Sequence, residues 1–197
     1  MTILTDTEIQ ANIESGFIGF SPYDPDMVNP NSIDVTLGNH FIYYTKNTVP
    51  IDILDPRTIN YCTESVRTRE WLIEPGKFLL ATTRETITLP SNIVASIEGK
   101  SSLARVGLSI HVTGGWIDSG FSGKITLEMF NANVRPIKLI EGMRIGQIVF
   151  FKTGMNCKLP YNMRPNSKYN GQDETTLSKY FKNNPKNWII GDNSYER

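Results

Sequence analysis

The chain has 197 residues, a length typical of one domain with a hydrophobic core of its own, and we treat residues 1–197 as a single domain. Its 20 basic and 20 acidic residues cancel to a formal net charge of zero, which excludes the broad positive field of a nucleic-acid binder. Cys62 and Cys157 are too few for a disulfide framework and too far apart for a C-x-x-C site. No apolar run suits a membrane span or signal peptide, so we expect a soluble, cytoplasmic protein, or one in a host's cytoplasm.

The first predicted element is a helix over residues 6–15. Thr5 and Glu8 have the spacing of a capping box, and Gly16 provides a stop. Ile9 and Ile13 form a narrow apolar stripe, typical of a helix that packs on a sheet edge or on a neighbouring subunit.

Short strands separated by turns follow the helix. A turn-rich loop is predicted over residues 17–30, a strand over residues 31–38 that Phe41 and Tyr43 continue, and an irregular loop over the polar residues 45–69. Further strands are predicted over residues 71–73, 78–83, 85–89, 94–98, 124–130, 136–140 and 144–152. So many short strands at such spacing indicate an all-β barrel or double sheet.

Residues 98–131 concentrate the residue types that a nucleotide site needs. Ser101 is predicted to cap a short helix whose free N–H groups face an anion, and Lys100 and Arg105 add positive charge. An ordinary capped surface turn is the alternative, because loops rich in Gly and Ser are common.

A carboxylate on the strand at residues 124–130 is the second candidate feature. Alternation sends Ile125, Leu127 and Met129 to one side of this strand and Glu128 to the other. Glu128 is then either a solvated surface carboxylate or, in a sheet-lined pocket, a general base. Upstream, the glycines at 114 and 115 allow the main chain to approach a ligand, because neither carries a Cβ atom.

These motifs resemble the nucleotide-binding core of the dCTP deaminases, which share their fold with the trimeric dUTPases. The matching segments are residues 99–105 (GKSSLAR), 111–113 (HVT), 117–123 (IDSGFSG), 127–128 (LE) and 167–172 (SKYNGQ). The resemblance implies a dUTPase-like distorted barrel or jelly roll with a short N-terminal helix. It also implies a C-terminal arm, residues 160–197, that closes over the nucleotide. Residues 183–197 lie beyond the resemblance, and their Trp188, Ile189 and Ile190 are candidates for a subunit contact.

The resemblance also implies a role for each site residue. Glu128 would shuttle protons, Ser101 and Arg105 would position water and stabilise the intermediate, and Asp118 would hold the deoxyribose 3′-hydroxyl or activate water against the α-phosphate. A turn aspartate without chemistry is the alternative for Asp118. The implied substrate-binding residues are Lys100, Ser101, Ser102, Arg105, Val112, Thr113, Gly114, Trp116, Asp118, Thr126, Leu127, Glu128, Tyr161, Lys168 and Gln172.

Hydrolytic deamination of cytosine is usually zinc chemistry, which carries H-x-E and P-C-x-x-C signatures. Neither His40 nor His111 is followed by x-Glu, and the cysteines are not paired. We therefore expect no zinc and no metal held by protein side chains, with Mg²⁺ bound through the nucleotide triphosphate.

The pair Gly115-Trp116 bears on the product. Deaminases that release dUTP usually carry His-Arg there, whereas bifunctional enzymes carry Gly plus an aromatic residue. The resemblance therefore implies a bifunctional enzyme that converts dCTP to dUMP, ammonia and pyrophosphate for thymidylate synthesis. A deaminase that releases dUTP, a dUTPase alone and a nucleotide-binding regulatory module without catalysis are the alternatives.

Two positions depart from the residues that are usual in the family. Lys100 replaces the usual arginine, which removes a bidentate phosphate contact, and Gly114 replaces the usual alanine, which loosens its loop.

The resemblance also implies partners. The expected partners are dCTP and dUTP, dTTP as a candidate feedback inhibitor, and copies of the chain itself in a homotrimer or hexamer. Residues 101–105 and 111–118 would then face each other across a subunit interface. No nucleic acid or membrane partner is expected.

Overall fold

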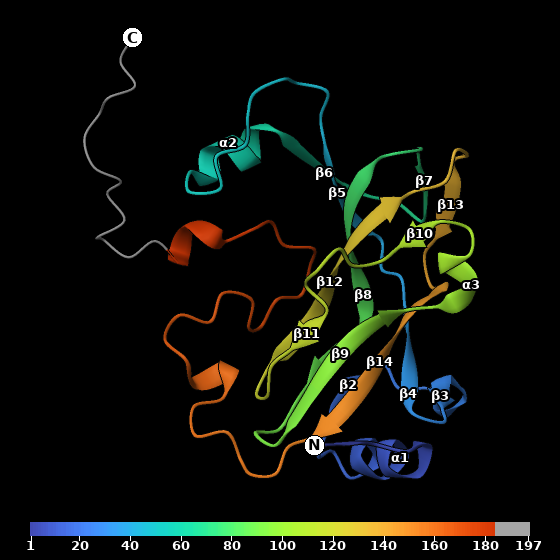
Figure 1. Ribbon diagram of the computed structural model, residues 1–197, viewed down its shortest axis with the longest axis vertical. Helices are drawn as coiled ribbons and strands as arrows, with labels where there is room; N and C mark the ends of the chain where they lie inside the picture. Colours follow the sequence, from blue (N-terminus) through green and yellow to red (C-terminus); the bar gives the residue numbers. More distant parts are fainter. Residues whose placement is uncertain (184–197) are drawn as a thin grey trace.

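Two six-stranded antiparallel sheets form the body of the protein in the computed structural model, which describes residues 1–183 (Figure 1). The first sheet has the order β11-β9-β14-β4-β3, with β1 beside β14, and the second has the order β10-β12-β8-β5-β6, with β2 beside β8. Strands β7 and β13 form a separate pair. This arrangement confirms the expected all-β class.

The first sheet contains β1 (Thr2–Ile3), β3 (Val28–Asn29), β4 (Ser32–Thr36), β9 (Ile93–Gly99), β11 (Trp116–Ile117) and β14 (Arg144–Lys152). The second contains β2 (Gly19–Ser21), β5 (His40–Tyr44), β6 (Thr63–Arg67), β8 (Phe78–Thr88), β10 (Leu108–Ser109) and β12 (Ser122–Asn131), and the small pair is β7 (Glu70–Ile73) with β13 (Ile137–Ile140). The helices are α1 (Asp6–Glu14), α2 (Pro56–Tyr61) and α3 (Ser101–Ala104), with 3₁₀ turns η1 (Pro25–Met27), η2 (Tyr161–Met163) and η3 (Tyr180–Asn183).

Both sheets contribute to one hydrophobic core. Val35 of β4, Leu127 and Met129 of β12, and Phe150 of β14 are all 0% exposed and belong to the same cluster of buried side chains. Each such side chain contributes about 1.5–3 kcal/mol by leaving water. The core therefore holds β12 rigidly, and β12 is the strand that carries Glu128.

Strand β4 is buried on its polar side as well. Asp34 and Thr36 are 1% and 3% exposed, and each is paired. Thr36 donates hydrogen bonds from its backbone nitrogen and hydroxyl to the buried Glu85 of β8 (2.9 and 2.6 Å), and Lys100 donates to Asp34 (2.6 Å). Burial of these polar groups is tolerated because every one of them has a partner.

The N-terminal helix confirms its prediction. It spans Asp6–Glu14, the capping box between Thr5 and Glu8 is formed, and Ile9 and Ile13 are buried. Gly16 follows with φ = +74°, the left-handed conformation that glycine adopts at a helix end.

The prediction of an irregular loop over residues 45–69 is wrong, because this segment contains helix α2 and strand β6. Asp55 caps helix α2 by accepting a hydrogen bond from the backbone nitrogen of Arg57, and Pro56 occupies the first turn. Strand β6 then pairs antiparallel with β5. Because β6 is an edge strand, most of its side chains face solvent, and its apolar alternation is too weak to read from the sequence.

Two other predicted boundaries also change. Strands expected over residues 78–83 and 85–89 are one strand, β8, whose pairing with β12 is irregular, so the alternation changes phase near Arg84. The loop expected over residues 17–30 contains β2, η1 and β3. These pieces have two or three residues each, too few to show a period.

Helix α3 exists, but Ser101 does not cap it. The capping position is Lys100, no side chain supplies a capping hydrogen bond, and Ser101 is the first helical residue. The helix has only four residues and follows directly from the end of β9. The Ser101 hydroxyl is therefore not engaged at its own helix end.

A C-terminal arm follows β14, as expected. It carries η2 and η3 and lies on the side of the molecule where β11 and β12 are found, drawn from orange to red in Figure 1. Trp188, Ile189 and Ile190 lie outside the described residues, so the subunit contact suggested for them stays a prediction.

Candidate active site

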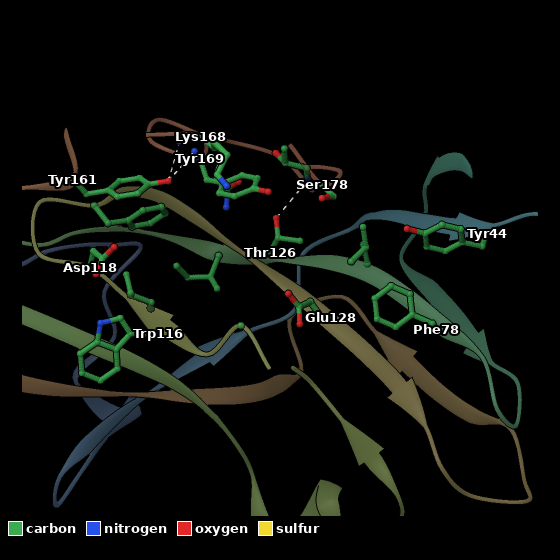
Figure 2. A pocket seen from close by; sticks show the side chains of 17 residues that line it. Tyr44, Phe78, Trp116, Asp118, Thr126, Glu128, Tyr161, Lys168, Tyr169 and Ser178 are labelled. Carbon is green, nitrogen blue, oxygen red and sulfur yellow. Dashed lines mark hydrogen bonds between the residues drawn. The ribbon is translucent and has the colours of Figure 1, made fainter. Parts of the chain in front are cut away.

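A cavity of about 480 Å³ lies between β12, the segment that contains β11, and the arm (Figure 2). Its walls come from segments far apart in the sequence. The lining residues on the body are Tyr44, Phe78, Leu80, Gly114, Trp116, Ile117, Asp118, Phe121, Ile125, Thr126 and Glu128, and those on the arm are Tyr161, Lys168, Tyr169, Gln172, Thr176 and Ser178.

Glu128 stands in this cavity because of the alternation of β12. Leu127 and Met129 point into the core at 0% exposure, so Glu128 and Thr126 point the other way, as predicted. In Figure 2 both side chains face the space beneath the arm. The backbone nitrogen of Val112 donates a hydrogen bond of 3.1 Å to Glu128 Oε2. One carboxylate oxygen is thus fixed, which orients the other.

The loop of residues 111–115 lies directly against this carboxylate. A Cβ atom added to Gly114 would come within 2.7 Å of Glu128 Oε1. The expectation that Gly114 merely loosens the loop is therefore incomplete, because glycine also permits the main chain to reach Glu128. Only Gly114 lies against the carboxylate, since a Cβ atom on Gly115 would instead meet the carbonyl oxygen of Ile97 at 3.1 Å. The approach of the two glycines to a ligand stays a prediction.

Trp116 lies in β11, and Asp118 is the residue that follows this strand. Pairing with β9 aligns Trp116 with Ser96 and Ile117 with Ala95, and the buried Ile117 fixes the strand on the core. Trp116 is 55% exposed and stacks on Phe151 with ring centroids 5.9 Å apart. Asp118 then enters the same cavity as Glu128. The two carboxylates that the sequence singled out share one site.

Tyr161 organises the first part of the arm. Its hydroxyl accepts hydrogen bonds from the backbone nitrogens of Lys168 and Tyr169, both at 3.0 Å. Its ring lies 6.0 Å from that of Phe121 on the body. Tyr161 therefore stabilises the turn that carries Lys168, in addition to lining the cavity.

Gln172 attaches the arm to β12. Its side-chain nitrogen donates to the carbonyl oxygen of Lys124 (2.6 Å), and the backbone nitrogen of Lys124 donates to the carbonyl oxygen of Gln172 (2.9 Å). Further along, the backbone nitrogen of Thr176 donates to the hydroxyl of Thr126 (3.3 Å). Gln172 and Thr126 both line the cavity, and their binding of substrate stays a prediction.

Several residues of the site were not predicted. Tyr169 lines the cavity, and the ammonium of Lys179 lies 5.4 Å from the centre of its ring and donates to the carbonyl oxygen of Lys168 (2.9 Å). Burial lowers the pKa of Lys179. Tyr169 stands inside the SKYNGQ segment, so the sequence held a signal for it. No sequence signal marked Tyr44 and Phe78 as site residues. Their rings lie 5.9 Å apart only because β5 pairs with β8.

A second group of predicted residues lies outside the cavity of this chain. Ser101, Ser102, Arg105, Val112 and Thr113 are exposed and do not line it. Lys100 does not line it either, and its ammonium binds Asp34. The Leu127 side chain is fully buried, so only the Leu127 backbone is available for the predicted contact with substrate. One described chain therefore presents only part of the predicted site.

Among residues 1–183, no group of three or more His, Cys, Asp or Glu side chains could hold a metal ion. Cys62 is buried and Cys157 is exposed, and both are free thiols. No helix in this part of the chain has the length and apolar character needed to cross a membrane.

Comparison with known proteins connects this geometry to a family. The family model described as dCTP deaminase-like matches residues 3–153. A protein of Methanospirillum hungatei named "dCTP deaminase, dUMP-forming" is 50% identical over 181 residues, which cover 92% of this chain and 97% of the relative. A protein of the same name from Streptomyces griseus is 42% identical over 184 residues, covering 92% and 96%.

A solved structure gives the same result for the fold. The 2′-deoxycytidine 5′-triphosphate deaminase from Agrobacterium tumefaciens superposes with a TM-score of 0.60 at 25% identity, over 75% of this chain and 47% of that chain. The family match includes the segments that bear Asp118 and Glu128, and the expected dUTPase-like architecture is confirmed. This chain therefore belongs to the dCTP deaminase-like family.

Proposed function

We propose that this protein deaminates dCTP and then hydrolyses the triphosphate, so that dUMP, ammonia and pyrophosphate leave and dUMP serves thymidylate synthesis. The observation that carries the proposal is the presence of two carboxylates, Glu128 and Asp118, in one cavity beside Gly115-Trp116. Each carboxylate can serve one of the two hydrolytic steps. The family and the names of its relatives support the same activity.

In the first step water adds to C4 of the cytosine and ammonia departs, which gives dUTP. Glu128 takes a proton from this water and returns it to the departing amino group. The hydrogen bond from the Val112 backbone nitrogen holds the carboxylate in place for both transfers. The apolar wall of Tyr44 and Phe78 limits water near the carboxylate, which strengthens its interactions with the substrate.

In the second step water attacks the α-phosphate of dUTP, and pyrophosphate leaves from dUMP. Asp118 is the base for this water, and it also hydrogen bonds to the deoxyribose 3′-hydroxyl. Lys168 and Gln172 of the arm contact the nucleotide from above. Mg²⁺ enters with the triphosphate as its counter-ion and needs no cage of protein side chains.

The site is completed by a neighbouring subunit in this proposal. Lys100, Ser101, Ser102 and Arg105 lie outside the cavity of their own chain, yet their residue types suit phosphate and water. A homotrimer, or a hexamer of two trimers, closes such head-to-tail contacts. Val112 and Thr113 belong to the chain that holds the cavity, where the Val112 backbone binds Glu128, and in this proposal they face the neighbour's residues 101–105 across the same interface. We also propose dTTP as a feedback inhibitor and the cytoplasm as the location.

Chromatography of nucleotides over a dCTP time course tests this function. We expect ammonia, dUMP and pyrophosphate to rise together with little free dUTP. Asp118→Asn is expected to reduce pyrophosphate release by at least about 100-fold, because the base for that step is lost. Accumulation of dUTP as the stable product of the unsubstituted enzyme would instead identify a deaminase that stops at dUTP. Conversion of dUTP alone, without ammonia, would identify a dUTPase.

A further inference from the structure

The cavity that holds Glu128 continues past this carboxylate to an end lined by apolar side chains. The residues there are Tyr44 of β5 with Phe78 and Leu80 of β8. We call this end of the cavity the aromatic recess. In the chemistry proposed above these side chains serve only to limit water, so the space beside them has no assigned occupant.

The strand register places the aromatic recess on the side of Glu128 that faces away from Asp118. Asp118 lies in the turn that leads into β12. Glu128 is paired with Leu80 across the sheet. Phe78 belongs to the next pair on this face, two residues or about 7 Å further along β12. Figure 2 shows the same order, with Glu128 between Asp118 and Phe78.

The aromatic recess is apolar and partly shielded from water. Leu80 is 7% exposed, and the ring of Phe78 lies 5.9 Å from that of Tyr44 on the neighbouring strand. Burial raises the pKa of Tyr44, in agreement with a dry environment. An amino group that faces such a wall finds few hydrogen-bond partners, whereas an alkyl group gains free energy there by leaving water.

The orientation of a bound cytosine nucleotide follows from the proposed function, in which Asp118 holds the sugar and Glu128 serves C4 of the base. In cytosine the sugar is attached at N1 and the amino group at C4, on opposite sides of the ring. A base that lies between the two carboxylates therefore directs its amino group past Glu128 and towards Phe78. The aromatic recess thus faces the outer side of the nitrogen that leaves.

We propose that the aromatic recess accepts a small alkyl group on this nitrogen, so that the protein also hydrolyses N4-alkylated dCTP. This second activity rests on the proposed function and uses the same residues. The oxygen of water forms a bond to C4, the C4–N4 bond breaks, and the nitrogen leaves with its alkyl group as a primary amine. Glu128 transfers one proton of the water to the amine, and N3 of the ring receives the other. The uracil nucleotide formed is the same as from dCTP, and no oxidant or further reactant is needed.

A second cavity adjoins the aromatic recess. It has a volume of about 350 Å³, and its lining includes Trp71 and Leu72. Tyr44 and Phe78 line both cavities. A smaller residue at position 78 therefore lengthens the aromatic recess towards the second cavity, which makes the size of the accepted alkyl group adjustable by substitution.

The first measurement compares N4-methyl-dCTP with dCTP on the full-length, unsubstituted protein. Mass spectrometry follows methylamine, and chromatography follows the uracil nucleotides. We expect equal amounts of methylamine and uracil nucleotide, with kcat/KM within about 10-fold of that for dCTP. A methyl group that does not fit an apolar site costs about 10- to 200-fold, so a loss beyond about 10-fold would overturn the proposal.

Two substitutions of Phe78 test where the alkyl group binds. Phe78→Trp adds volume and is expected to lower the ratio of kcat/KM for N4-methyl-dCTP to that for dCTP by at least about 10-fold. Phe78→Leu removes volume and is expected to raise the ratio for N4-butyl-dCTP to N4-methyl-dCTP by about 10-fold. Each ratio cancels effects that the two substrates share, such as altered folding.

Phe17→Trp and Phe17→Leu are the matched controls for these substitutions, because Phe17 is 47% exposed and does not line the cavity. Both controls should leave the two ratios unchanged. A ratio that also stays unchanged in either Phe78 variant would place the alkyl group elsewhere and contradict the proposal.

Failure of this inference and failure of the proposed function give different results. If dCTP is converted to dUMP while N4-methyl-dCTP reacts more than about 10-fold more slowly, the proposed function stands and the inference fails. If neither nucleotide loses its amine, the proposed function fails and the second activity with it. Calorimetry then tests the aromatic recess by binding alone. A Kd for N4-methyl-dCTP within about 10-fold of that for dCTP supports it as the alkyl site, and a weaker one removes it.

Discussion

The main chain at Gly114 lies so close to Glu128 that a Cβ atom on residue 114 would come within 2.7 Å of Oε1. The atom met is the end of a flexible side chain, and alanine is usual in the family at this position, so Gly114→Ala should be accommodated, whereas the larger, branched Gly114→Val is expected to move the carboxylate without disturbing the fold. The hydrogen bond from the Val112 backbone nitrogen would then be lost or lengthened. We expect kcat for ammonia release to fall about tenfold, the effect of one hydrogen bond to a charged group, with Tm nearly unchanged. Paired kinetics and calorimetry check this, and an unaltered kcat would show that the contact does not position Glu128.

Replacement of the carboxylate itself tests the role of Glu128. Glu128→Gln keeps the volume and one hydrogen-bond acceptor but cannot carry the proton, so ammonia release is expected to fall by at least about 100-fold. Binding of dCTP, measured by calorimetry on the same preparation, should stay within about threefold. Glu70→Gln, an exposed carboxylate outside the cavity, serves as the control. Near-normal turnover of Glu128→Gln would remove it as the proton shuttle.

Subunit complementation tests whether residues 101–105 complete a neighbour's site. Arg105→Ala and Glu128→Gln are each expected to be inactive alone, because each damages every site of a uniform oligomer. Subunits mixed after mild dissociation should regain activity, because some sites then receive intact Arg105 from one chain and intact Glu128 from another. Light scattering should give a trimer or a multiple of it. An active monomer, or mixtures that stay inactive despite subunit exchange, would contradict a shared site.

The pairing of Lys100 with Asp34 predicts a stability effect. Asp34 is 1% exposed and receives Lys100 at 2.6 Å, Asn29 at 2.9 Å and Arg144 at 3.4 Å. Lys100→Met would leave the negative charge of the buried Asp34 stabilised only by Asn29 and Arg144. We expect a loss of about 3 kcal/mol in the free energy of unfolding. Lys138→Met breaks an exposed ion pair and should cost less than about 1 kcal/mol. Denaturant titration compares the two, and equal small losses would show that Arg144 and Asn29 suffice for Asp34.

The sequence alone determined the features that depend on local pattern. The capping box of Thr5 and Glu8 and the alternation that points Glu128 away from the core are both as predicted. Each depends on residues within one helix turn or one strand, where spacing fixes the direction of a side chain. The spaced motifs also sufficed to identify the family.

Only the tertiary structure decided which distant residues share the cavity. Tyr44 and Phe78 meet because β5 pairs with β8, and no local period encodes that pairing. Strand β6 was missed because an edge strand shows its side chains to water, which erases the apolar alternation. The contact of Gly114 with Glu128 and the binding of Lys100 by buried Asp34 likewise depend on where loops return to the sheets, which is set by the packing of the whole core.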